Sequence, residues 1–394
     1  MLTIIHDNPV RALGDLVEID RKFLDGMATF VPAVGVPVTS THPLRRGAAA
    51  IDVLQVPAAS LPFRLVALDT EERGGYSAAG RAQLAELVAK SRLVTGSYIG
   101  GGFAAAQRHG VPYVMALEYD LGTQVTVTRL GVGDPLRRLA RTVRCVADYV
   151  RRQIPQMRRA AAIHCNGFPI YDAARRWNAQ CMLYLDSRMR RDMVIEATPL
   201  QERLRSLPGR RARVLYSGRY EAMKGALDFV QVAIHCVRDG VSADFLCHGQ
   251  GAQGEAMRAA VAAAGVADRV QVRDAVPFPE LVAIARTCDL FVACHVQSDP
   301  SCSYLEAMGA GLPVLGYGNR MWRRMAAESA AGNQVPVHDQ AALAAAIADL
   351  LREPQRLIEW SNRARAYALQ HCFEQEFSLR TAGIRAAYAA APAR

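Results

Sequence analysis

After Ala212 the chain alternates short apolar segments with helical stretches, and this alternation limits the fold more than any other feature of the sequence. The apolar segments are short and bounded by glycine or polar residues, which indicates buried strands at Val214–Tyr216, Ala243–Cys247, Val270–Arg273, Leu290–Ala293 and Val314–Tyr317. Helical patterns begin near Gly225, Gly254, Pro279, Tyr304 and Asp339. Helices of this length join parallel strands by right-handed crossovers, so the segment predicts a doubly wound α/β domain.

The first half of the chain shows a looser version of the same alternation. Its apolar segments predict strands at Leu2–His6, Leu65–Leu68, Leu93–Thr95, Tyr113–Ala116, Ala161–His164 and Cys181–Leu185. Between the halves, Arg205–Ala212 combines Pro208, Gly209 and three arginines, a polar break that predicts a linker. We therefore expect two Rossmann-like, doubly wound domains facing each other across a cleft, residues 1–205 and 213–372, and a final helix at 373–394 that packs back on the first domain.

Composition narrows the possible functions. The formal net charge is +10, but only three of the 47 basic residues are lysines, which we interpret as a compositional preference for arginine. Because no zinc-finger spacing, aromatic RNA-binding motif or helix-turn-helix pattern accompanies the charge, no nucleic-acid partner is expected. The nine cysteines form no CxxC pair, and the sequence has neither a signal peptide nor an apolar run of about 18 residues, which indicates a reduced, cytoplasmic protein.

Residues Leu136 to Ile154 predict a helix with one apolar and one basic face. The apolar face consists of Leu136, Leu139, Ala140, Val143, Val146, Ala147, Val150 and Ile154, and the basic face of Arg137, Arg138, Arg141, Arg144, Arg151 and Arg152. An amphipathic helix usually packs its apolar face on a core and leaves its charged face in solvent. The alternative is peripheral contact with an anionic membrane, at its inner face.

The segment SGRYEAMKG, Ser217–Gly225, joins the strand at Val214–Tyr216 to the next helix. Loops at the carboxyl ends of parallel strands carry the ligand sites of doubly wound sheets. In this loop, which also contains Gly218, Arg219 can hold a diphosphate through its planar guanidinium, and Lys224 adds a compact charge. The alternative is a solvated turn, but the short spacing and the closing Gly225 favour phosphate binding.

The segment LEAMGAGLPV, Leu305–Val314, places Glu306 in the first turns of a helix. There the carboxylate either complements the helix dipole or accepts hydrogen bonds from ribose hydroxyls. The preceding loop favours binding, because it is polar and the free amides of the helix start can meet phosphate or sugar hydroxyls. Its candidate binding residues are Ser298, Asp299, Pro300, Ser301, Cys302 and Ser303.

Gly249, Gly251 and Gly254 form a GxGxxG motif after the strand at Ala243–Cys247, with Asp268 and Asp274 about twenty residues farther on. Taken alone, this pattern predicts a dinucleotide-binding dehydrogenase. However, the dinucleotide fingerprint normally follows the first strand of its domain, and here it follows the second. A glycine-rich turn serves any ligand that approaches the strand end closely.

Five motifs in a fixed order resemble the C-terminal domain of retaining glycosyltransferases of family 4, which have the two-domain GT-B fold. They are GRY followed by KG, then FLCHGQG, DRVQVRDAV, CDLFVA and LEAMGAGLPVLG, and the resemblance extends from Arg213 to about Cys372. It implies that Arg219 and Lys224 bind the donor diphosphate and that Glu306 binds the ribose. It also implies that Gly249 and Gly251 line the same cleft, and that the nucleobase edge meets Arg273, Asp274, Ala275 and Val276.

The chain departs from the family pattern at two positions. Members of the family carry a second glutamate eight positions before the one matched by Glu306, and here Ser298 stands at that position with Asp299 beside it. In the first domain, a family histidine contacts the sugar after a strand like Tyr113–Ala116, and the matching residue is Glu118, which either acts on acceptor or sugar or has no catalytic part. Gly14 follows the first strand, where the glycine loop of the family approaches donor phosphate or acceptor.

No two aspartates lie two residues apart, so the Asp-x-Asp metal clamp of the other major glycosyltransferase architecture is absent from the sequence, and neither a metal nor a cofactor is expected. The sequence therefore predicts a metal-independent retaining glycosyltransferase. It would move a hexose from a nucleotide-diphosphate sugar to a hydroxyl of a saccharide, lipid-linked or small-molecule acceptor. Two alternatives stay open: a non-catalytic GT-B protein that binds a sugar nucleotide or supports a partner enzyme, and an NAD-dependent oxidoreductase.

Overall fold

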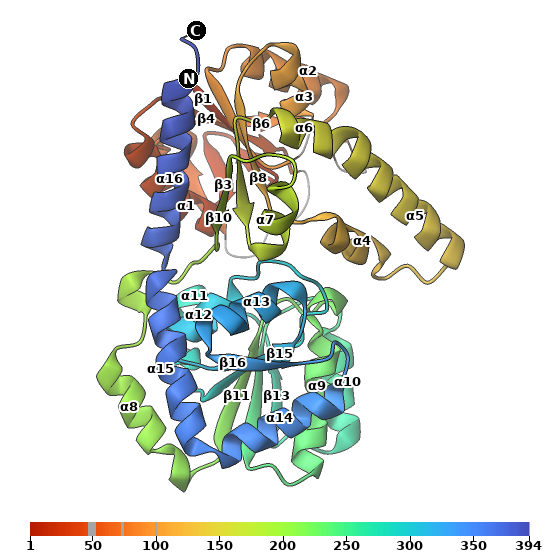
Figure 1. Ribbon diagram of the computed structural model, residues 1–394, viewed down its shortest axis with the longest axis vertical. Coiled ribbons are helices and arrows are strands. Elements are labelled where there is room, and N and C mark those ends of the chain that lie inside the picture. Colours follow the sequence, from red (N-terminus) through yellow and green to blue (C-terminus); the bar gives the residue numbers. More distant parts are fainter. Residues whose placement is uncertain (46–52, 72–74, 99–100, 394) are drawn as a thin grey trace. The chain divides into compact units, whose positions relative to one another are not determined.

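The computed structural model describes residues 1–45, 53–71, 75–98 and 101–393, which form two compact units (Figure 1). Unit 1 comprises Met1–Asp120, Ala147–Tyr184 and Phe377–Arg394, and unit 2 comprises Leu121–Val146 and Leu185–Glu376. The chain thus crosses between the units at Leu185, upstream of the linker expected at 205–212. Helix α8 (Ala197–Arg205) instead packs Leu200 and Leu204 into the core of unit 2.

Unit 1 is built on a seven-stranded parallel sheet with the order β10-β9-β8-β7-β1-β4-β6. Its strands are β1 (Leu2–Ile5), β4 (Val38–Pro43), β6 (Arg64–Leu68), β7 (Leu93–Gly96), β8 (Tyr113–Leu117), β9 (Ala162–Asn166) and β10 (Cys181–Tyr184). All six predicted strands are present, but β4 was not predicted because its sequence, VTSTHP, is mostly polar. Its polar side chains are buried and bonded; His42, for example, contacts Ser40 Oγ and the carbonyl oxygen of Asn8 at 2.9 Å each.

A second sheet follows β1 and was also not predicted. It is antiparallel, with the order β2-β3-β5, formed by β2 (Arg11–Leu13), β3 (Leu16–Asp20) and β5 (Val53–Pro57). Gly14 lies at the tight turn between β2 and β3 with a φ of 65°, a left-handed conformation that favours glycine. The chain therefore does not pass from the first strand directly into a helix, as a glycine loop would require.

The helices before unit 2's sheet vary in length and in burial. They are α1 (Arg21–Val34), α2 (Ala78–Ala89), α3 (Gly102–Arg108), α4 (Leu121–Arg129), α5 (Pro135–Asp148), α6 (Ile154–Arg159) and α7 (Phe168–Ala174). A π-helical segment, Tyr149–Gln153, continues α5 into α6. The predicted amphipathic helix is present, but its expected packing on a core is wrong, because no residue of α5 is buried.

Unit 2 contains a six-stranded parallel sheet with the order β13-β12-β11-β14-β15-β16. The strands are β11 (Ala212–Ser217), β12 (Ala243–His248), β13 (Val270–Arg273), β14 (Leu290–Ala293), β15 (Val314–Tyr317) and β16 (Gly332–Val335), the last of which was not predicted. The intervening helices are α9 (Ala226–Arg238), α10 (Gly254–Ala264), α11 (Phe278–Ala285), α12 (Ser303–Gly309) and α13 (Arg320–Ser329). Helices α14 (Gln340–Arg352), α15 (Pro354–Gln370) and α16 (Phe373–Ala390) complete the chain.

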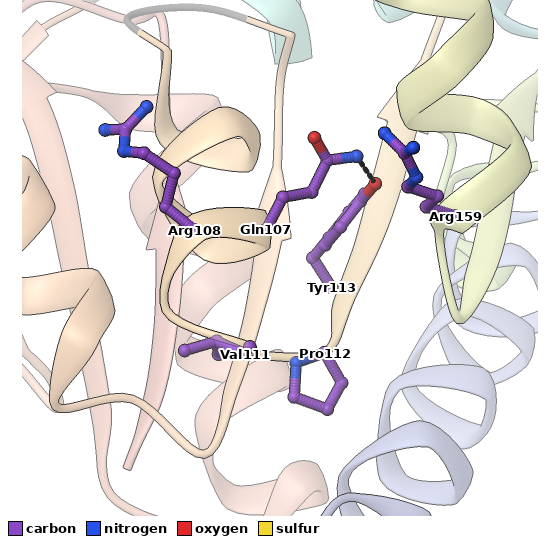
Figure 2. Close-up of a pocket in the computed structure, with 7 residues that line it drawn as sticks. Gln107, Arg108, Val111, Pro112, Tyr113 and Arg159 are labelled. Carbon is purple, nitrogen blue, oxygen red and sulfur yellow. Dashed lines mark hydrogen bonds between the residues drawn. The ribbon is translucent and has the colours of Figure 1, made fainter.

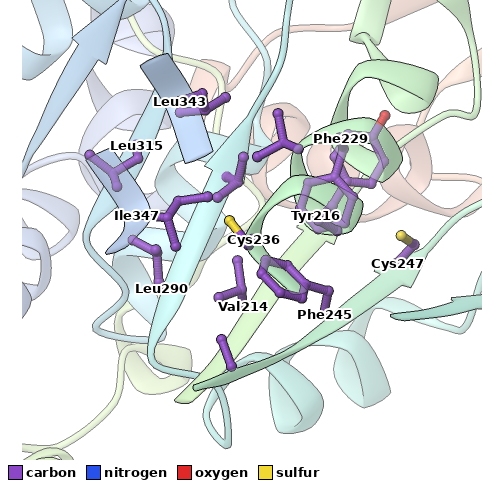
Figure 3. Packing of buried hydrophobic residues seen from close by; sticks show 14 of the residues in the cluster. Val214, Tyr216, Phe229, Cys236, Phe245, Cys247, Leu290, Leu315, Leu343 and Ile347 are labelled. Carbon is purple, nitrogen blue, oxygen red and sulfur yellow. The ribbon is translucent and has the colours of Figure 1, made fainter. Parts of the chain in front are cut away.

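The strand order of unit 2 reverses between β11 and β14. From β11 the chain first proceeds outward through β12 to β13, then returns to β14 and proceeds the other way to β16. The main core packs β11, β12 and β14 against α9 and α14, with fully buried Phe229, Phe245 and Leu343 (Figure 3). This core fixes the carboxyl ends of β11 and β14 side by side, and sheets of this kind bind their ligands at such a reversal.

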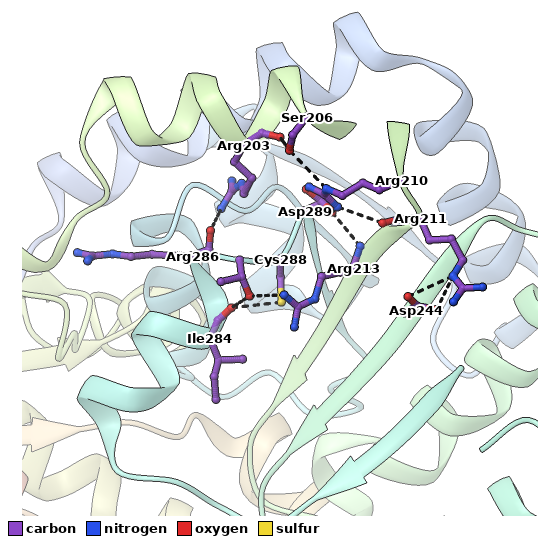
Figure 4. A network of polar contacts seen from close by, with 11 residues as sticks. Arg203, Ser206, Arg210, Arg211, Arg213, Asp244, Ile284, Arg286, Cys288 and Asp289 are labelled. Atoms are coloured by element: carbon purple, nitrogen blue, oxygen red, sulfur yellow. Dashed lines mark hydrogen bonds and ion pairs between the residues drawn. The ribbon is translucent and has the colours of Figure 1, made fainter. Parts of the chain in front are cut away.

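A network of arginines lies at the amino ends of the strands of the same sheet (Figure 4). Arg203 donates to the carbonyl oxygens of Ala310 and Gly311 at 2.8 and 2.7 Å, which satisfies backbone groups left free at the end of α12. Arg210 forms a two-pronged pair with the fully buried Asp289 at 2.7 and 2.8 Å. These two arginines therefore have structural contacts in unit 2.

Helix α16 returns the chain to unit 1. Ile384 belongs to the core of unit 1, and Phe377 and Tyr388 pack against that core. Arg92 Nε donates to the carbonyl oxygen of Ala391 at 3.1 Å. None of the helices that the structure describes combines the length and the apolar character needed to cross a membrane.

Candidate functional site

The candidate site lies where the loops after β11 and β14 meet. Gly225, the N-cap residue of α9, has a φ of 62°, and a Cβ atom there would lie 2.0 Å from the carbonyl oxygen of Cys294. The amide of Val296 donates to the carbonyl oxygen of Met223 at 3.2 Å. Glycine at 225 therefore permits the close contact between the loops, which brings the phosphate-binding candidates next to the loop before α12.

Lys224 is buried in this contact and forms an ion pair. Its Nζ lies 2.5 Å from Asp299 Oδ2, and each side chain is only 8% exposed. Burial raises the pKa of the Asp299 carboxyl, but the charge of Lys224, the neighbouring His295 and hydrogen bonds from Lys224 and Gln297 together hold that pKa below its usual value. The cation predicted to meet phosphate therefore has an internal carboxylate partner.

A histidine that the sequence analysis did not single out completes this cluster. His295 Nδ1 lies 3.9 Å from Asp299 Oδ1, and the ring packs edge-on against Tyr304. Burial, with the charge of Lys224 second, lowers the pKa of His295 to about 3, so the ring is neutral at physiological pH. Asn319 Nδ2 donates to the His295 carbonyl oxygen at 3.0 Å and to the Tyr304 hydroxyl at 3.2 Å, which fixes this wall of the site.

Arg219 lies in the same loop as Lys224 but is exposed. Its guanidinium lies 3.6 Å from the sulfur of Met223, and its charge contributes to the lowered pKa of His295. The loop thus presents one exposed and one buried cation near the same histidine, an arrangement that suits an anionic ligand.

Glu306 is 7% exposed and is paired with an arginine that the sequence did not indicate. Arg188 Nε donates to Glu306 Oε1 at 2.7 Å, and its guanidinium carbon lies 4.2 Å from the centre of the Phe278 ring. Arg188 follows β10 in the chain, within the segment LDSRMRR, whose basic residues carry no recognisable spacing. Glu306 is therefore an oriented carboxylate rather than a helix-dipole partner alone.

Most side chains of the loop before α12 form hydrogen bonds within the protein. Ser298 Oγ accepts from the backbone amide of Arg320 at 3.1 Å, so the residue at the family glutamate position is bonded to the start of α13. Ser301 and Ser303 bond to each other at 2.8 Å, and the Cys302 thiol donates to Asp186 at 3.5 Å. Asp299, next to Pro300, supplies the carboxylate of this loop.

The glycines after β11 and β12 meet each other. A Cβ atom on Gly249 would lie 1.9 Å from the carbonyl oxygen of Gly218, and one on Gly251 would lie 2.6 Å from that of Tyr220. Gly218 and Gly251 also have φ values of 153° and 149°. Close packing of two loops therefore explains why GxGxxG occurs after the second strand, without a dinucleotide.

The residues predicted to meet a nucleobase lie at the carboxyl end of β13. Arg273, Asp274 and Ala275 are exposed and Val276 is half-buried. Arg273 Nη2 donates to Gln271 at 2.6 Å, and Arg258 pairs with Asp274 at 2.5 Å. His248 ends the neighbouring strand β12, and burial lowers its pKa.

Two predicted residues lie in unit 1. Glu118 follows β8, is exposed, and accepts from Asn166 Nδ2 at 3.2 Å, where β9 ends. Gly14 lies at the β2–β3 turn described above. The carboxyl ends of β8 and β9 lie on the side of the sheet at which a ligand is expected.

An open pocket of about 540 Å³ lies near the amino ends of the strands of this sheet (Figure 2). It is lined by Gln107, Arg108 and Arg159 among others, near the start of β8. The Tyr113 hydroxyl, on its wall, accepts from Gln107 at 2.7 Å and donates to the carbonyl oxygen of Gln156 at 2.7 Å. Its position at the amino ends of the strands separates it from the expected ligand edge.

No cluster of three or more His, Cys, Asp or Glu side chains suited to a metal ion occurs within the described ranges. The charged groups of the site are Lys224 with Asp299, Arg188 with Glu306, and Arg219.

Comparisons with known proteins identify relatives of this chain. Residues 211–353 match the family described as glycosyl transferases group 1. The chain is 34% identical over 160 residues to a 2-deoxystreptamine N-acetyl-D-glucosaminyltransferase of Streptomyces fradiae, covering 40% of this chain and 38% of that protein. It is 27% identical over 188 residues to a phosphatidyl-myo-inositol mannosyltransferase of Mycobacterium leprae (strain TN), covering 46% and 49%. The chain thus spans between a third and a half of the length of the curated relatives it matches.

Solved structures show that the fold is GT-B. A sucrose-phosphate synthase from Thermosynechococcus elongatus superposes with a TM-score of 0.69 at 17% identity, covering 97% of this chain and 98% of that one. The Anabaena protein Alr3699/HepE, crystallised with UDP-glucose, superposes with a TM-score of 0.66 at 13% identity and the same coverage. The two-domain, Rossmann-like architecture predicted from the sequence is confirmed.

Proposed function

We propose that the protein is a glycosyltransferase that uses a nucleotide-diphosphate sugar, since residues 211–353 match the family of group 1 glycosyl transferases and the chain has the GT-B fold. It moves a hexose to a hydroxyl group of a saccharide, lipid-linked or small-molecule acceptor. The observation that carries this proposal is the buried Lys224 beside the exposed Arg219, at the reversal between β11 and β14.

In this proposal the donor diphosphate replaces Asp299 as the partner of Lys224. The ammonium and the Arg219 guanidinium then stabilise the negative charge that develops on the departing diphosphate. As cations beside the diphosphate, the two groups perform the task that a divalent ion performs in Asp-x-Asp enzymes. We therefore propose that the reaction needs neither a metal nor a cofactor.

Glu306 accepts hydrogen bonds from the ribose hydroxyls. Arg188 holds its carboxylate at 2.7 Å and is itself held against Phe278, so one carboxylate oxygen is fixed and the other can turn to the ligand. The nucleobase meets the backbone and side chains of 273–276 beyond β13. These assignments extend the family resemblance to residues that lie along the same edge of one sheet.

The proposed transfer proceeds with retention of the anomeric configuration. The bond between the anomeric carbon and the phosphate oxygen breaks, and its electron pair leaves with the diphosphate. The acceptor oxygen then bonds to the same face of the oxocarbenium-like sugar, while its proton passes to the leaving phosphate. Asp299 takes the place of the missing family glutamate beside the sugar, and Glu118 orients the acceptor.

Nine free cysteines and no disulfide among them suit a reducing compartment, so we place the reaction in the cytoplasm.

Nucleotide binding tests the proposal first. A thermal-shift screen with UDP, GDP and their common sugars identifies the nucleotide that binds, and calorimetry then measures its affinity. Arg219→Gln should weaken this binding by about 1.5–3 kcal/mol, or roughly 10- to 150-fold. Arg219 is exposed, so the substitution leaves the fold intact, and Arg238→Gln, at the far end of α9, is the matched control. Equal binding by the variant and the control would contradict the phosphate site.

Turnover tests the rest. Release of UDP or GDP that continues in EDTA, with a product of unchanged anomeric configuration by NMR, is the expected result. Nucleotide binding without turnover on any acceptor would favour the non-catalytic alternative, to which the replacement of the family glutamate by Ser298 points. Binding of NAD in place of a sugar nucleotide would favour the oxidoreductase.

A further inference from the structure

Helix α5 presents a row of large apolar side chains to solvent. Leu136 is 77% exposed, Leu139 61% and Val143 59%, and the row continues through Val146 and Val150. Five of the eight exposed large hydrophobic residues in the described part of the chain lie in this one stretch. Single exposed apolar residues need no explanation, but a contiguous row of this kind marks an interaction surface.

The row occupies one side of the helix and the arginines occupy the other. At 100° per residue, Leu136, Leu139, Val143, Val146 and Val150 fall within one stripe, and the arginines of the basic face, residues 137 to 152, point away from it. Between Pro135 and Arg152 there are six arginines and one acid, Asp148, which pairs with Arg152 at 3.3 Å. Residues 135–152 therefore carry a net charge of +5, on the side of the helix away from the apolar stripe.

We propose that this surface, Leu136 to Arg152, binds the surface of a bilayer that contains anionic phospholipids. The apolar stripe enters the boundary between headgroups and acyl chains, and the long arginine side chains reach up to the phosphates. A second copy of the chain would cover the stripe but would also bring two strongly basic helices together. A nucleic acid would satisfy the arginines and leave the stripe in water. The anionic bilayer is the partner that satisfies both faces, and its binding does not depend on the proposed transfer reaction.

Vesicle binding by the full chain tests this surface. The protein should sediment with phosphatidylcholine vesicles in proportion to their phosphatidylglycerol content and should stay in solution with phosphatidylcholine alone. Leu139→Glu should weaken this binding at least about tenfold, because it removes an inserted side chain and adds a negative charge. The matched control is Leu379→Glu, since Leu379 is a comparably exposed leucine, at 51%, on helix α16.

The basic face has its own prediction. Arg141→Gln and Arg144→Gln should each weaken binding about fivefold at low salt, and the difference should shrink as salt rises. Arg352→Gln, an exposed arginine at the end of α14, should change nothing.

Three results would overturn the proposal: vesicle binding that ignores lipid charge, equal losses in Leu139→Glu and Leu379→Glu, or a wild-type dimer in analytical ultracentrifugation that Leu139→Glu dissociates. The circular dichroism melting curve of each variant separates loss of binding from loss of fold. Because the stripe contacts no core, unchanged melting is expected for all of them.

Discussion

The ion pair between Lys224 and Asp299 gives the sharpest test of how the site is held. The two charges are 2.5 Å apart and 8% exposed each. At an effective dielectric constant of about 20, their attraction is roughly 7 kcal/mol, which burial of both charges largely offsets. Removing one partner therefore costs more than removing both, because the remaining charge is left buried without a counter-charge.

Lys224→Met and Asp299→Asn should each lower the free energy of unfolding of unit 2 by about 3–5 kcal/mol. For a unit of this size the melting temperature should fall by roughly 10 °C. The double variant Lys224→Met/Asp299→Asn should be more stable than either single variant, since it leaves no unpaired charge. The coupling energy of this cycle should be several kcal/mol.

Urea unfolding followed by tryptophan fluorescence measures this cycle, because Trp322 and Trp360 both lie in unit 2. Lys90→Met, at an exposed lysine after α2, is the control for the loss of a lysine and should unfold like the wild type. Additive losses in the double variant, or single variants as stable as the wild type, would refute the view that the pair is closed in the free protein.

Three further predictions follow from particular contacts. Gly225→Ala should destabilise unit 2 by more than about 3 kcal/mol, because its Cβ would meet the Cys294 carbonyl oxygen at 2.0 Å, whereas Gly240→Ala, with a φ of 73° and open space, should cost only about 1 kcal/mol in the same unfolding assay. Arg203→Met leaves the carbonyl oxygens that end α12 without their donor and should cost about 2–4 kcal/mol, against less than about 0.5 for the exposed Arg205→Met. Burial lowers the pKa of His42 to about 4 in the folded protein. Between about pH 6.5 and pH 4 the unfolded chain is therefore protonated at this histidine and the folded chain is not. As the pH falls through this range, the free energy of unfolding should decrease by about 3 kcal/mol on account of His42. His42→Gln should flatten the measured stability–pH curve in that range and His109→Gln, at an exposed histidine, should not; equal curves would contradict the burial argument.

Strand prediction succeeded where strands are apolar and failed where they are polar. The run from Val214 to Tyr216 and its counterparts carry their own signal, because parallel strands covered on both faces must be apolar. Strand β4 is equally buried, yet its Thr41 hydroxyl donates to the carbonyl oxygen of Ile4 on β1, and its His42 ring bonds to the carbonyl oxygen of Asn8. Local sequence does not contain those partners, so β4 could not be predicted.

The helix at 135–148 shows a second limit. A repeat of apolar residues at helical spacing is the same whether the stripe packs on a core or faces solvent. Only the tertiary structure decided between these, and it left Leu136 and Leu139 exposed.

The sequence by itself determined the architecture and which loop is the candidate for phosphate binding. Alternating strands and helices allow few arrangements, and the loop with Arg219 and Lys224 follows a strand end wherever that strand lies in the sheet. Tertiary structure alone decided which charges meet. Asp299 reaches Lys224 across 75 residues of chain and Arg188 reaches Glu306 across 118. Such pairs form only when packing in the folded sheet brings two loops close together. For Lys224 and Asp299, the contact of Gly225 with Cys294 sets the distance between the two loops.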